Sequence, residues 1–339
     1  MKKLRVAVLM GGKSPEHDIS LNSGREVVRY LNPKKYDSIP ITISRDGITW
    51  QIGDNKQLLS DSPAKKKVKS GKLKVESLTV SDHSSVIKNQ KIDLVFIAMH
   101  GPYGEDGTIQ GFLELIGVSY TGSGVLASAL GMDKISSRKF FTQVGLKTPK
   151  HRVVFKGEKM DYILDKFQFP VFVKPDNQGS SIGASLVKNE NDIQKALKIA
   201  WKYSNRAIVE EFIDGIEVTG SIIGNENPKA LPLIEIVPKT PFFDFQAKYN
   251  EKLCDEIVPA RISKFLTKKA QAAALKAFQA LGCKGIGRVD MIIRGNDVYV
   301  LEINTIPGLT PVSLVPKAAQ AAGISYPQLL DKIIESATP

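Results

Sequence analysis

Short apolar segments that end in glycine alternate with helical segments through the first third of the chain. Residues 4–10 (LRVAVLM) and 36–44 (YDSIPITIS) have the composition of buried strands, with a helix between them that ends near Leu31. Residues 92–101 (IDLVFIAMHG) form another such strand, and a short helix over 107–117 follows it. Strands that alternate with helices are typical of α/β folds. We therefore expect a doubly wound parallel sheet that binds ligands at the carboxyl ends of its strands.

A second unit begins near Met132 with a helix that Asp133 caps and Gly145 ends. It continues with strands at 169–175, 184–189 and 207–213, a glycine–serine loop at 176–183 and a helix over 191–203. This mixture predicts an α+β lobe.

The last unit contains a helix and a hairpin. An amphipathic helix runs from Thr267, its predicted N-cap, to Leu281, where Gly282 ends it. Two strands, GRVDMII and VYVLEIN, follow, and a turn at 294–297 joins them. We therefore expect three domains: an N-terminal α/β domain over 1–125, a central α+β lobe over 126–213 and a C-terminal α+β lobe over 214–339.

The composition favours a protein of the reducing cytoplasm without membrane association. The apolar run from Val6 to Met10 is too short for a signal peptide, and no run reaches the roughly 20 residues of a membrane span. The two cysteines, Cys254 and Cys283, are expected to be buried thiols rather than a disulfide.

The chain is basic, with 47 Lys and Arg against 35 Asp and Glu and a net charge of +12. Part of the excess lies in residues 65–74 (KKKVKSGKLK). Lysines of this kind bind nucleic acid in some proteins, but no aromatic residues alternate with them as they do on a base-stacking surface. A solvated loop is the favoured interpretation, and we expect no nucleic-acid partner. A positive protein also attracts anionic small molecules.

The stretch LMGGKSPEHDIS (9–20) resembles a phosphate loop at first sight. A Walker A loop needs a glycine five positions before Gly12, where this chain has Ala7, and the G-x-G-x-x-G pattern is also absent. Ser14 is the expected cap of the next helix, with Pro15 in its first turn. Glu16 then lies at the carboxyl end of the first strand, where an ionised carboxylate suits a substrate ammonium group.

A stronger phosphate candidate is the segment 173–183 (VKPDNQGSSIG). It places a lysine at the end of a strand, beside a loop whose N–H groups and hydroxyls suit phosphate oxygens. A flexible hairpin with an incidental lysine explains the same residues equally well.

The C-terminal hairpin carries polar residues on one face. Glu302 and Asn304 share a face of one strand, and Arg288 and Asp290 share a face of the other, since alternate residues of a strand point the same way. Three oxygen donors on neighbouring strands suit Mg²⁺, and Arg288 suits a carboxylate or phosphoryl oxygen. A solvated surface face is the weaker alternative.

Nearly the whole chain resembles the D-alanine–D-alanine ligases of the ATP-grasp carboxylate–amine ligase family. The matching segments are GGKSPEHDISLNSG (11–24), HGPYGEDGTIQG (100–111), YTGSGVLASALGMDK (120–134), KPDNQGSSIG (174–183), VEEFIDGIEVT (209–219), FFDFQAKY (242–249), GCKGIGRVD (282–290) and LEINTIPGLTPVSLVP (301–316). The resemblance implies an ATP-grasp architecture, a cytoplasmic homodimer and a role in peptidoglycan precursor synthesis. It implies that ATP phosphorylates one D-alanine and that the amine of a second D-alanine attacks the resulting acyl phosphate.

The same resemblance implies a set of site residues. ATP would be bound by Lys134, Lys174, Ser180, Ser181, Glu210, Glu211, Ile213 and Glu217. Two Mg²⁺ ions, with Mn²⁺ as a substitute, would be bound by Asp290, Glu302 and Asn304. D-Alanine would be bound by Glu16, His100, Lys248, Arg288, Gly308, Ser313 and Leu314, with Glu16, Ser180, Tyr249, Arg288 and Gly308 closest to the chemistry.

The segment 241–250 resembles the lid of this family and carries Tyr249. Depsipeptide-forming relatives have Phe at this position, so the tyrosine favours an amine as the second substrate. Related ligases that make D-alanyl-D-lactate or D-alanyl-D-serine are the alternative interpretation. His100 on its own would be read as a structural histidine at a strand end.

Overall fold

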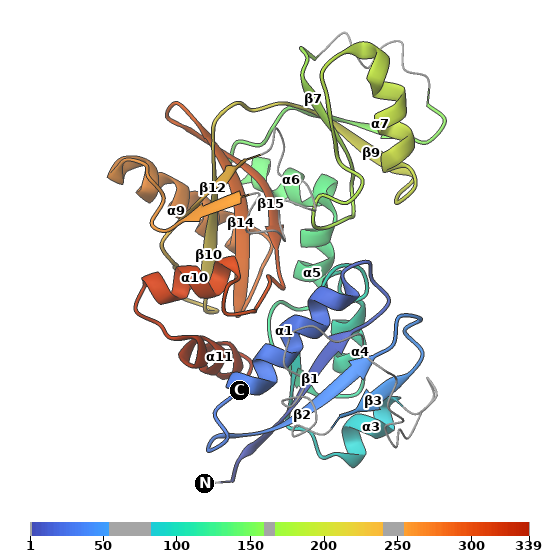
Figure 1. Cartoon of the computed structure of the whole chain (residues 1–339), viewed down its shortest axis with the longest axis vertical. Coiled ribbons are helices and arrows are strands. Elements are labelled where there is room, and N and C mark those ends of the chain that lie inside the picture. The colour runs from blue at the N-terminus through green and yellow to red at the C-terminus, as the bar shows by residue number, and fades with distance from the viewer. Residues whose placement is uncertain (1, 54–82, 159–166, 240–253, 339) are drawn as a thin grey trace.

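The described part of the chain forms three separate sheets, each from a different part of the sequence (Figure 1). The computed structural model describes residues 2–53, 83–158, 167–239 and 254–338. The lysine-rich stretch 65–74 and the predicted lid 241–250, with Lys248 and Tyr249, lie outside these residues.

The N-terminal sheet has the order β3-β2-β1-β4-β5. Strand β1 (Leu4–Gly11) runs parallel to β2 (Tyr36–Ile43) and β4 (Leu94–Ile97), β4 runs parallel to β5 (Ser119–Tyr120), and β3 (Trp50–Ile52) is an antiparallel edge strand. Helices α1 (His17–Tyr30), α3 (His83–Asn89) and α4 (Thr108–Leu115) accompany it. The residues of β1 alternate between two cores, one with α1 and one with α3 and α4. Both faces are therefore covered, which confirms the doubly wound sheet.

The central sheet is antiparallel, with the order β6-β9-β7-β8. Its strands are β6 (His151–Phe155), β9 (Arg206–Glu211), β7 (Val171–Pro175) and β8 (Ser185–Val187). Helix α7 (Ile193–Ala200), which follows a short 3₁₀ turn η3 (Glu190–Asp192), packs on one apolar face. The opposite face carries the polar side chains of Lys174 and Glu210, because these residues alternate with the buried valines.

The C-terminal sheet has the order β13-β12-β10-β14-β15, with β11 beside β10. Its strands are β10 (Ile216–Ile223), β11 (Lys229–Ala230), β12 (Ile234–Pro238), β13 (Cys254–Ile257), β14 (Ile286–Arg294) and β15 (Asp297–Asn304). Helix α9 (Lys264–Ala280) packs on it, as do α5 (Val125–Met132) and α6 (Lys134–Gln143). The predicted hairpin of β14 and β15 is confirmed, with an irregularity between Asp290 and Met291.

Two predicted helix caps are wrong. Helix α9 begins at Lys264, and its N-cap is Ser263, whose Oγ accepts a hydrogen bond from the Leu266 N–H at 3.2 Å. Thr267 lies in the first turn, where its hydroxyl donates to the Ser263 carbonyl.

Helix α1 begins at His17 rather than after Ser14, because Ser14 closes a turn of its own by accepting the Glu16 N–H. Asp133 does cap α6, as predicted.

The first and last parts of the chain share one hydrophobic core. Helices α10 (Leu314–Ala321) and α11 (Tyr326–Glu335) both contribute buried residues to it, and α11 lies beside α1 (Figure 1). The rings of Tyr30 and Tyr326 meet edge to face at 5.1 Å. This shared core holds the N-terminal sheet against the C-terminal sheet.

Candidate active site

A cavity of about 410 Å³ lies between the central and C-terminal sheets. Its walls include apolar side chains from both sheets, among them Phe172, Ile182, Ile292 and Leu301. Nine of the residues predicted for ATP or metal binding also line it: Lys134, Lys174, Ser181, Glu210, Glu211, Ile213, Glu217, Asp290 and Glu302. The fold therefore brings together residues from α6, β7, β9, β10, β14 and β15 around one space.

The two predicted phosphate lysines enter this cavity from different elements. Lys134 is the first residue of α6, and its Nζ lies 3.3 Å from Glu302 Oε2 and donates to the Gln178 carbonyl at 2.6 Å. Lys174 comes from β7, and its Nζ lies 2.8 Å from Glu210 Oε1. Each ammonium group is thus paired with a carboxylate at the edge of the cavity.

Glu210 lies between two cations. Arg138 of α6 donates from Nη2 to Glu210 Oε2, while Lys174 holds the other oxygen. Burial would raise the pKa of Glu210, but the charges of Arg138 and Lys174 outweigh it and lower the pKa to about 2. Arg138 was not predicted. The available signal was its position one helical turn after Lys134, which puts both side chains on the same face.

The acidic hairpin face is present as predicted. Asp290 lies opposite Glu302, and Arg288 lies opposite Asn304, across β14 and β15. Arg288 binds Asp290 in a bidentate pair, with Nε to Oδ1 at 2.8 Å and Nη2 to Oδ2 at 2.9 Å. Thr219 of β10, which the sequence did not single out, donates to Asp290 Oδ1 at 2.8 Å.

The donor set of this hairpin fits a hard divalent cation. Asp290 and Glu302 present carboxylate oxygens at positions that are largely buried and open to the cavity, and the Asn304 amide lies at the end of the same face. No cluster of three or more His, Cys, Asp or Glu suited to a metal occurs within the part of the chain that the structure describes. An ion here would therefore need oxygens from its ligand in addition to the protein, as is usual for Mg²⁺.

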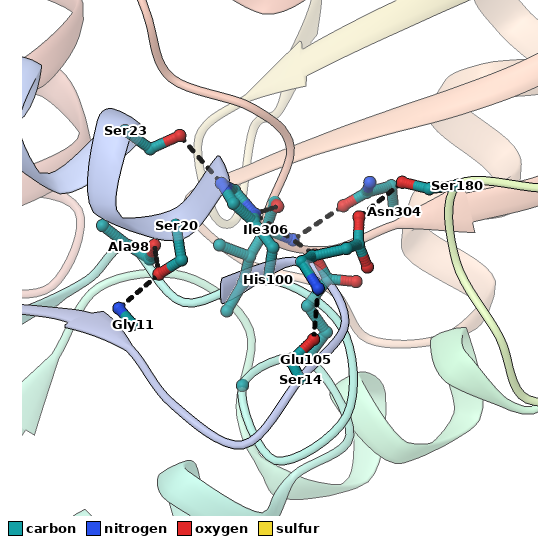
Figure 2. Close-up of polar contacts among 12 residues, drawn as sticks. Gly11, Ser14, Ser20, Ser23, Ala98, His100, Glu105, Ser180, Asn304 and Ile306 are labelled. Carbon is teal, nitrogen blue, oxygen red and sulfur yellow. Dashed lines mark hydrogen bonds and ion pairs between the residues drawn. The ribbon is translucent and has the colours of Figure 1, made fainter. Parts of the chain in front are cut away.

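The glycine–serine loop of the central lobe contacts the N-terminal domain. Ser180 donates a hydrogen bond to Glu16 Oε1 (Figure 2). Ser180 and Ser181 both have left-handed backbones, with φ of 50° and 57°, which is an uncommon conformation for residues other than glycine. Gly179 approaches Glu16 so closely that a Cβ would lie 3.1 Å from its Oε2. The loop is therefore shaped to reach the carboxylate at the end of β1.

His100 is the centre of a buried polar network (Figure 2). Its Nε2 is 2.8 Å from Ser23 Oγ, and its Nδ1 is 3.0 Å from the Ile306 carbonyl and 3.5 Å from Glu105. Burial would lower the pKa of His100, but the hydrogen bond and charge of Glu105 outweigh it and raise this pKa. The ring therefore joins the end of β4 to the segment that follows β15.

The last group of predicted residues lies just beyond β15. Ser313 Oγ accepts from the Thr310 N–H at 3.1 Å and lies 2.7 Å from the Thr310 hydroxyl. Leu314 is the first residue of α10, so its N–H is one of the free donors of a helix N-terminus. Gly308 packs against Ser313, since a Cβ would lie 3.1 Å from the serine Oγ. N–H and hydroxyl donors therefore gather here in a form suited to an anion.

Two family models and several relatives match the chain. Residues 5–123 match the model for the D-ala D-ala ligase N-terminus, and residues 140–335 match the model for the D-ala D-ala ligase C-terminus. The D-alanine–D-alanine ligase of Syntrophobacter fumaroxidans is 42% identical over 99% of this chain and 98% of its own length.

Solved structures agree with these matches. The VanG D-Ala:D-Ser ligase from Enterococcus faecalis superposes with a TM-score of 0.84 at 33% identity, over 99% of this chain and all of that one. The D-alanine–D-alanine ligase from Bacillus anthracis complexed with ATP gives a TM-score of 0.77 at 32% identity, over 98% of this chain and 97% of that one.

Proposed function

This chain belongs to the D-alanine–D-alanine ligase family, and from that membership and the geometry of the cavity we propose that it uses ATP to join two D-alanine molecules, releasing ADP and phosphate. The observation that carries the proposal is the cavity itself, where two lysines, an acidic hairpin and apolar walls from separate lobes surround one space. The product, D-alanyl-D-alanine, is a building block of peptidoglycan.

The cavity supplies a place for each part of ATP. Phe172, Ile292 and Leu301 give the base an apolar slot. Glu210 and the backbone of Glu211 and Ile213 bind the edge of the adenine ring, and Glu217 binds the ribose hydroxyls. Lys134 and Lys174 move from their carboxylate partners to the phosphates, while Ser180 and Ser181 of the loop cover the terminal phosphate. Positioning and charge neutralisation then account for most of the catalysis.

Asp290, Glu302 and Asn304 are the residues that would hold Mg²⁺, with two ions expected and Mn²⁺ as a substitute. Bound there, the metal supplies neutralisation of the negative charge on the phosphates. Lys134 contributes to the same task, because its Nζ already lies 3.3 Å from Glu302.

The reaction follows from the arrangement of the remaining residues. Glu16 binds the ammonium group of the first D-alanine, whose carboxylate oxygen attacks the γ-phosphorus of ATP, so that ADP leaves and an acyl phosphate forms. The amine of the second D-alanine attacks the acyl carbon, and Arg288 and the Gly308 N–H stabilise the tetrahedral oxyanion. Collapse of this centre breaks the bond to the phosphate oxygen and releases phosphate. Ser313, the Leu314 N–H and Lys248 bind the carboxylate of the second substrate.

The second substrate is the point on which the relatives differ. The VanG structure is that of a D-Ala:D-Ser ligase, whereas the curated relatives are D-alanine–D-alanine ligases. Tyr249 supports an amine rather than a hydroxy acid. We expect ADP release with D-alanine alone and little stimulation by D-serine or D-lactate. ADP release that depends on D-serine or D-lactate would overturn this assignment.

A homodimer and a cytoplasmic location complete the proposal. Leu115 in α4 and Leu126 in α5 are 89% and 71% exposed on adjoining helices, which suits a self-complementary apolar patch. Substitution of both leucines by lysine should convert a dimer to a monomer in light scattering. A wild-type monomer at micromolar concentration would contradict the dimer.

Two buried free thiols and the need for ATP favour the cytoplasm. No helix among the described segments is long and apolar enough to cross a bilayer.

A further inference from the structure

Arg138 is a completely buried cation to which none of the preceding steps gives a role. It lies in the middle of α6, one turn after Lys134, and points toward the central sheet. Its Nη2 donates to Glu210 Oε2, whereas its Nε and Nη1 have no hydrogen-bond partner among the described residues. Burying a guanidinium with two unused donors is costly, so the position needs an explanation beyond packing.

The two cations of Glu210 differ in their access to the cavity. Lys174 lines the cavity and its side chain is 14% exposed, whereas the Arg138 side chain is 0% exposed and lies behind Glu210. Lys174 is therefore able to turn from Glu210 Oε1 toward a phosphate in the cavity. The buried Arg138 side chain does not reach the cavity, so its Nη2 remains hydrogen-bonded to Glu210 Oε2.

We propose that Arg138 is a positioning residue, the permanent counter-ion that keeps Glu210 ionised and oriented toward the purine when Lys174 turns to the phosphates. This inference rests on the proposed function, since it takes the cavity as the ATP site. Without Arg138, departure of Lys174 would leave a buried carboxylate with no cation, and such a group takes up a proton instead.

The protonation state of Glu210 decides what its side chain is able to recognise. An ionised carboxylate only accepts hydrogen bonds, and so it fits the 6-amino group of adenine and repels the 6-oxo group of hypoxanthine. A protonated carboxyl also donates, which removes this discrimination. Sites that hydrogen-bond a specific substrate group reject analogues that lack it by large factors. Arg138 is thus expected to determine the preference for ATP over ITP.

The test compares kcat/KM for ATP and ITP in wild type and in Arg138→Met, Arg138→Gln and Arg138→Lys. We expect the ATP:ITP ratio to fall at least about tenfold in the Met and Gln variants, mainly through KM for ATP, and to stay within about threefold of wild type in Arg138→Lys. Arg29→Met, which alters an arginine of α1 paired with Glu26, is the matched control and should leave the ratio unchanged. The Gln variant carries the test should Arg138→Met be insoluble.

A double variant separates the proposed role from a merely structural one. In a Glu210→Gln background, Arg138→Met should not lower the ATP:ITP ratio further, because both changes act through the same carboxylate. A ratio that stays at the wild-type value in Arg138→Met and Arg138→Gln, with only a lower melting temperature, would overturn the inference, as would additive effects in the double variant. Absence of D-alanine-dependent ADP release from wild type would overturn the proposed function as well.

Discussion

The hydroxyl of Ser180 donates a hydrogen bond to the carboxylate of Glu16, which lies 164 residues earlier in the chain. The contact joins the glycine–serine loop of the central lobe to the end of the first strand of the N-terminal domain (Figure 2). The loop that we propose to cover the nucleotide phosphates is thereby tied to the carboxylate that we propose to bind the substrate amine. The position of the loop therefore depends on Glu16.

Replacement of Glu16 by Gln should lower kcat/KM for D-alanine at least about 100-fold, because the partner of the substrate ammonium loses its charge. KM for ATP should change little, since Glu16 does not line the nucleotide cavity and the amide oxygen of Gln is still able to accept the hydrogen bond from Ser180. Initial rates of ADP release at varied D-alanine and ATP check both statements. Glu226→Gln, at an exposed position, is the control. A Glu16→Gln enzyme with wild-type kinetics for D-alanine would contradict the assignment.

Gly101→Ala should damage D-alanine binding by displacing Glu16. Gly101 has φ of +73°, and an added Cβ would lie 2.6 Å from both Glu16 Oε2 and Ser14 Oγ. Gly157 has φ of +88° with nothing within 4 Å of an added Cβ, so Gly157→Ala carries the same kind of backbone strain without the clash. We expect both variants to lose about 1 kcal/mol of stability, and only Gly101→Ala to raise KM for D-alanine, by tenfold or more. Equal KM values for D-alanine in the two variants would show that the added Cβ at position 101 does not displace Glu16.

The sequence predicts most accurately those features that depend on local periodicity. Alternation along β14 and β15 is enough to place Asp290 and Glu302 on one face, because the period of a strand leaves no choice of side. The alternation of strands with helices likewise identifies the parallel N-terminal sheet. The helix caps at Ser263 and Glu16 were misplaced because several polar residues near each helix start satisfy the same capping rule.

Contacts between lobes could not be predicted from periodicity. The residues alone left 173–183 evenly balanced between a phosphate loop and a hairpin, and they ranked neither Lys134 nor Ser313. Those roles came from the resemblance, because they depend on how lobes far apart in sequence pack together. Arg138 escaped both approaches, since an arginine in a polar helix is normally exposed.

Glu302→Gln should abolish ADP formation, with a loss of at least about 1,000-fold, while the fold stays intact. The change removes one of the two carboxylates in the proposed Mg²⁺ ligand set and also weakens the pairing with Lys134. ADP release over a Mg²⁺ titration, together with far-UV circular dichroism, measures both effects. Glu335→Gln, on an exposed face of α11, should behave as wild type. Wild-type turnover by Glu302→Gln would remove Glu302 from the metal site.

The buried group around Glu210 should make the fold sensitive to acid. The folded pKa of about 2 lies below the ordinary value of 4.5, so the ionised carboxylate stabilises the fold above pH 4.5 and loses this effect as the pH falls toward 2. Glu210→Gln should cost about 3 kcal/mol at pH 7 by leaving Arg138 and Lys174 without their anion. Urea unfolding of both proteins should show this difference shrinking below pH 4.5. A difference that stays constant from pH 7 to pH 3 would contradict the account.

Ser263→Ala should destabilise the C-terminal lobe by about 1 kcal/mol, since it removes the side chain that caps α9. Thr267→Ala, one turn later, should change the free energy of unfolding by less than half as much, because its hydroxyl only supplements the helix backbone. Denaturant unfolding of the two variants distinguishes the caps. A larger effect at Thr267 would restore the cap expected from the sequence.

In the proposed reaction, a carboxylate oxygen of one D-alanine attacks the γ-phosphate of ATP in this cavity and leaves with the phosphate when the second amine attacks the acyl carbon. Incubation with ATP, Mg²⁺ and D-alanine labelled with ¹⁸O in both carboxylate oxygens tests it directly by mass spectrometry of the released phosphate. We expect one ¹⁸O atom in each phosphate, together with D-alanyl-D-alanine and ADP in equal amounts. Unlabelled phosphate, or ADP without dipeptide, would contradict it.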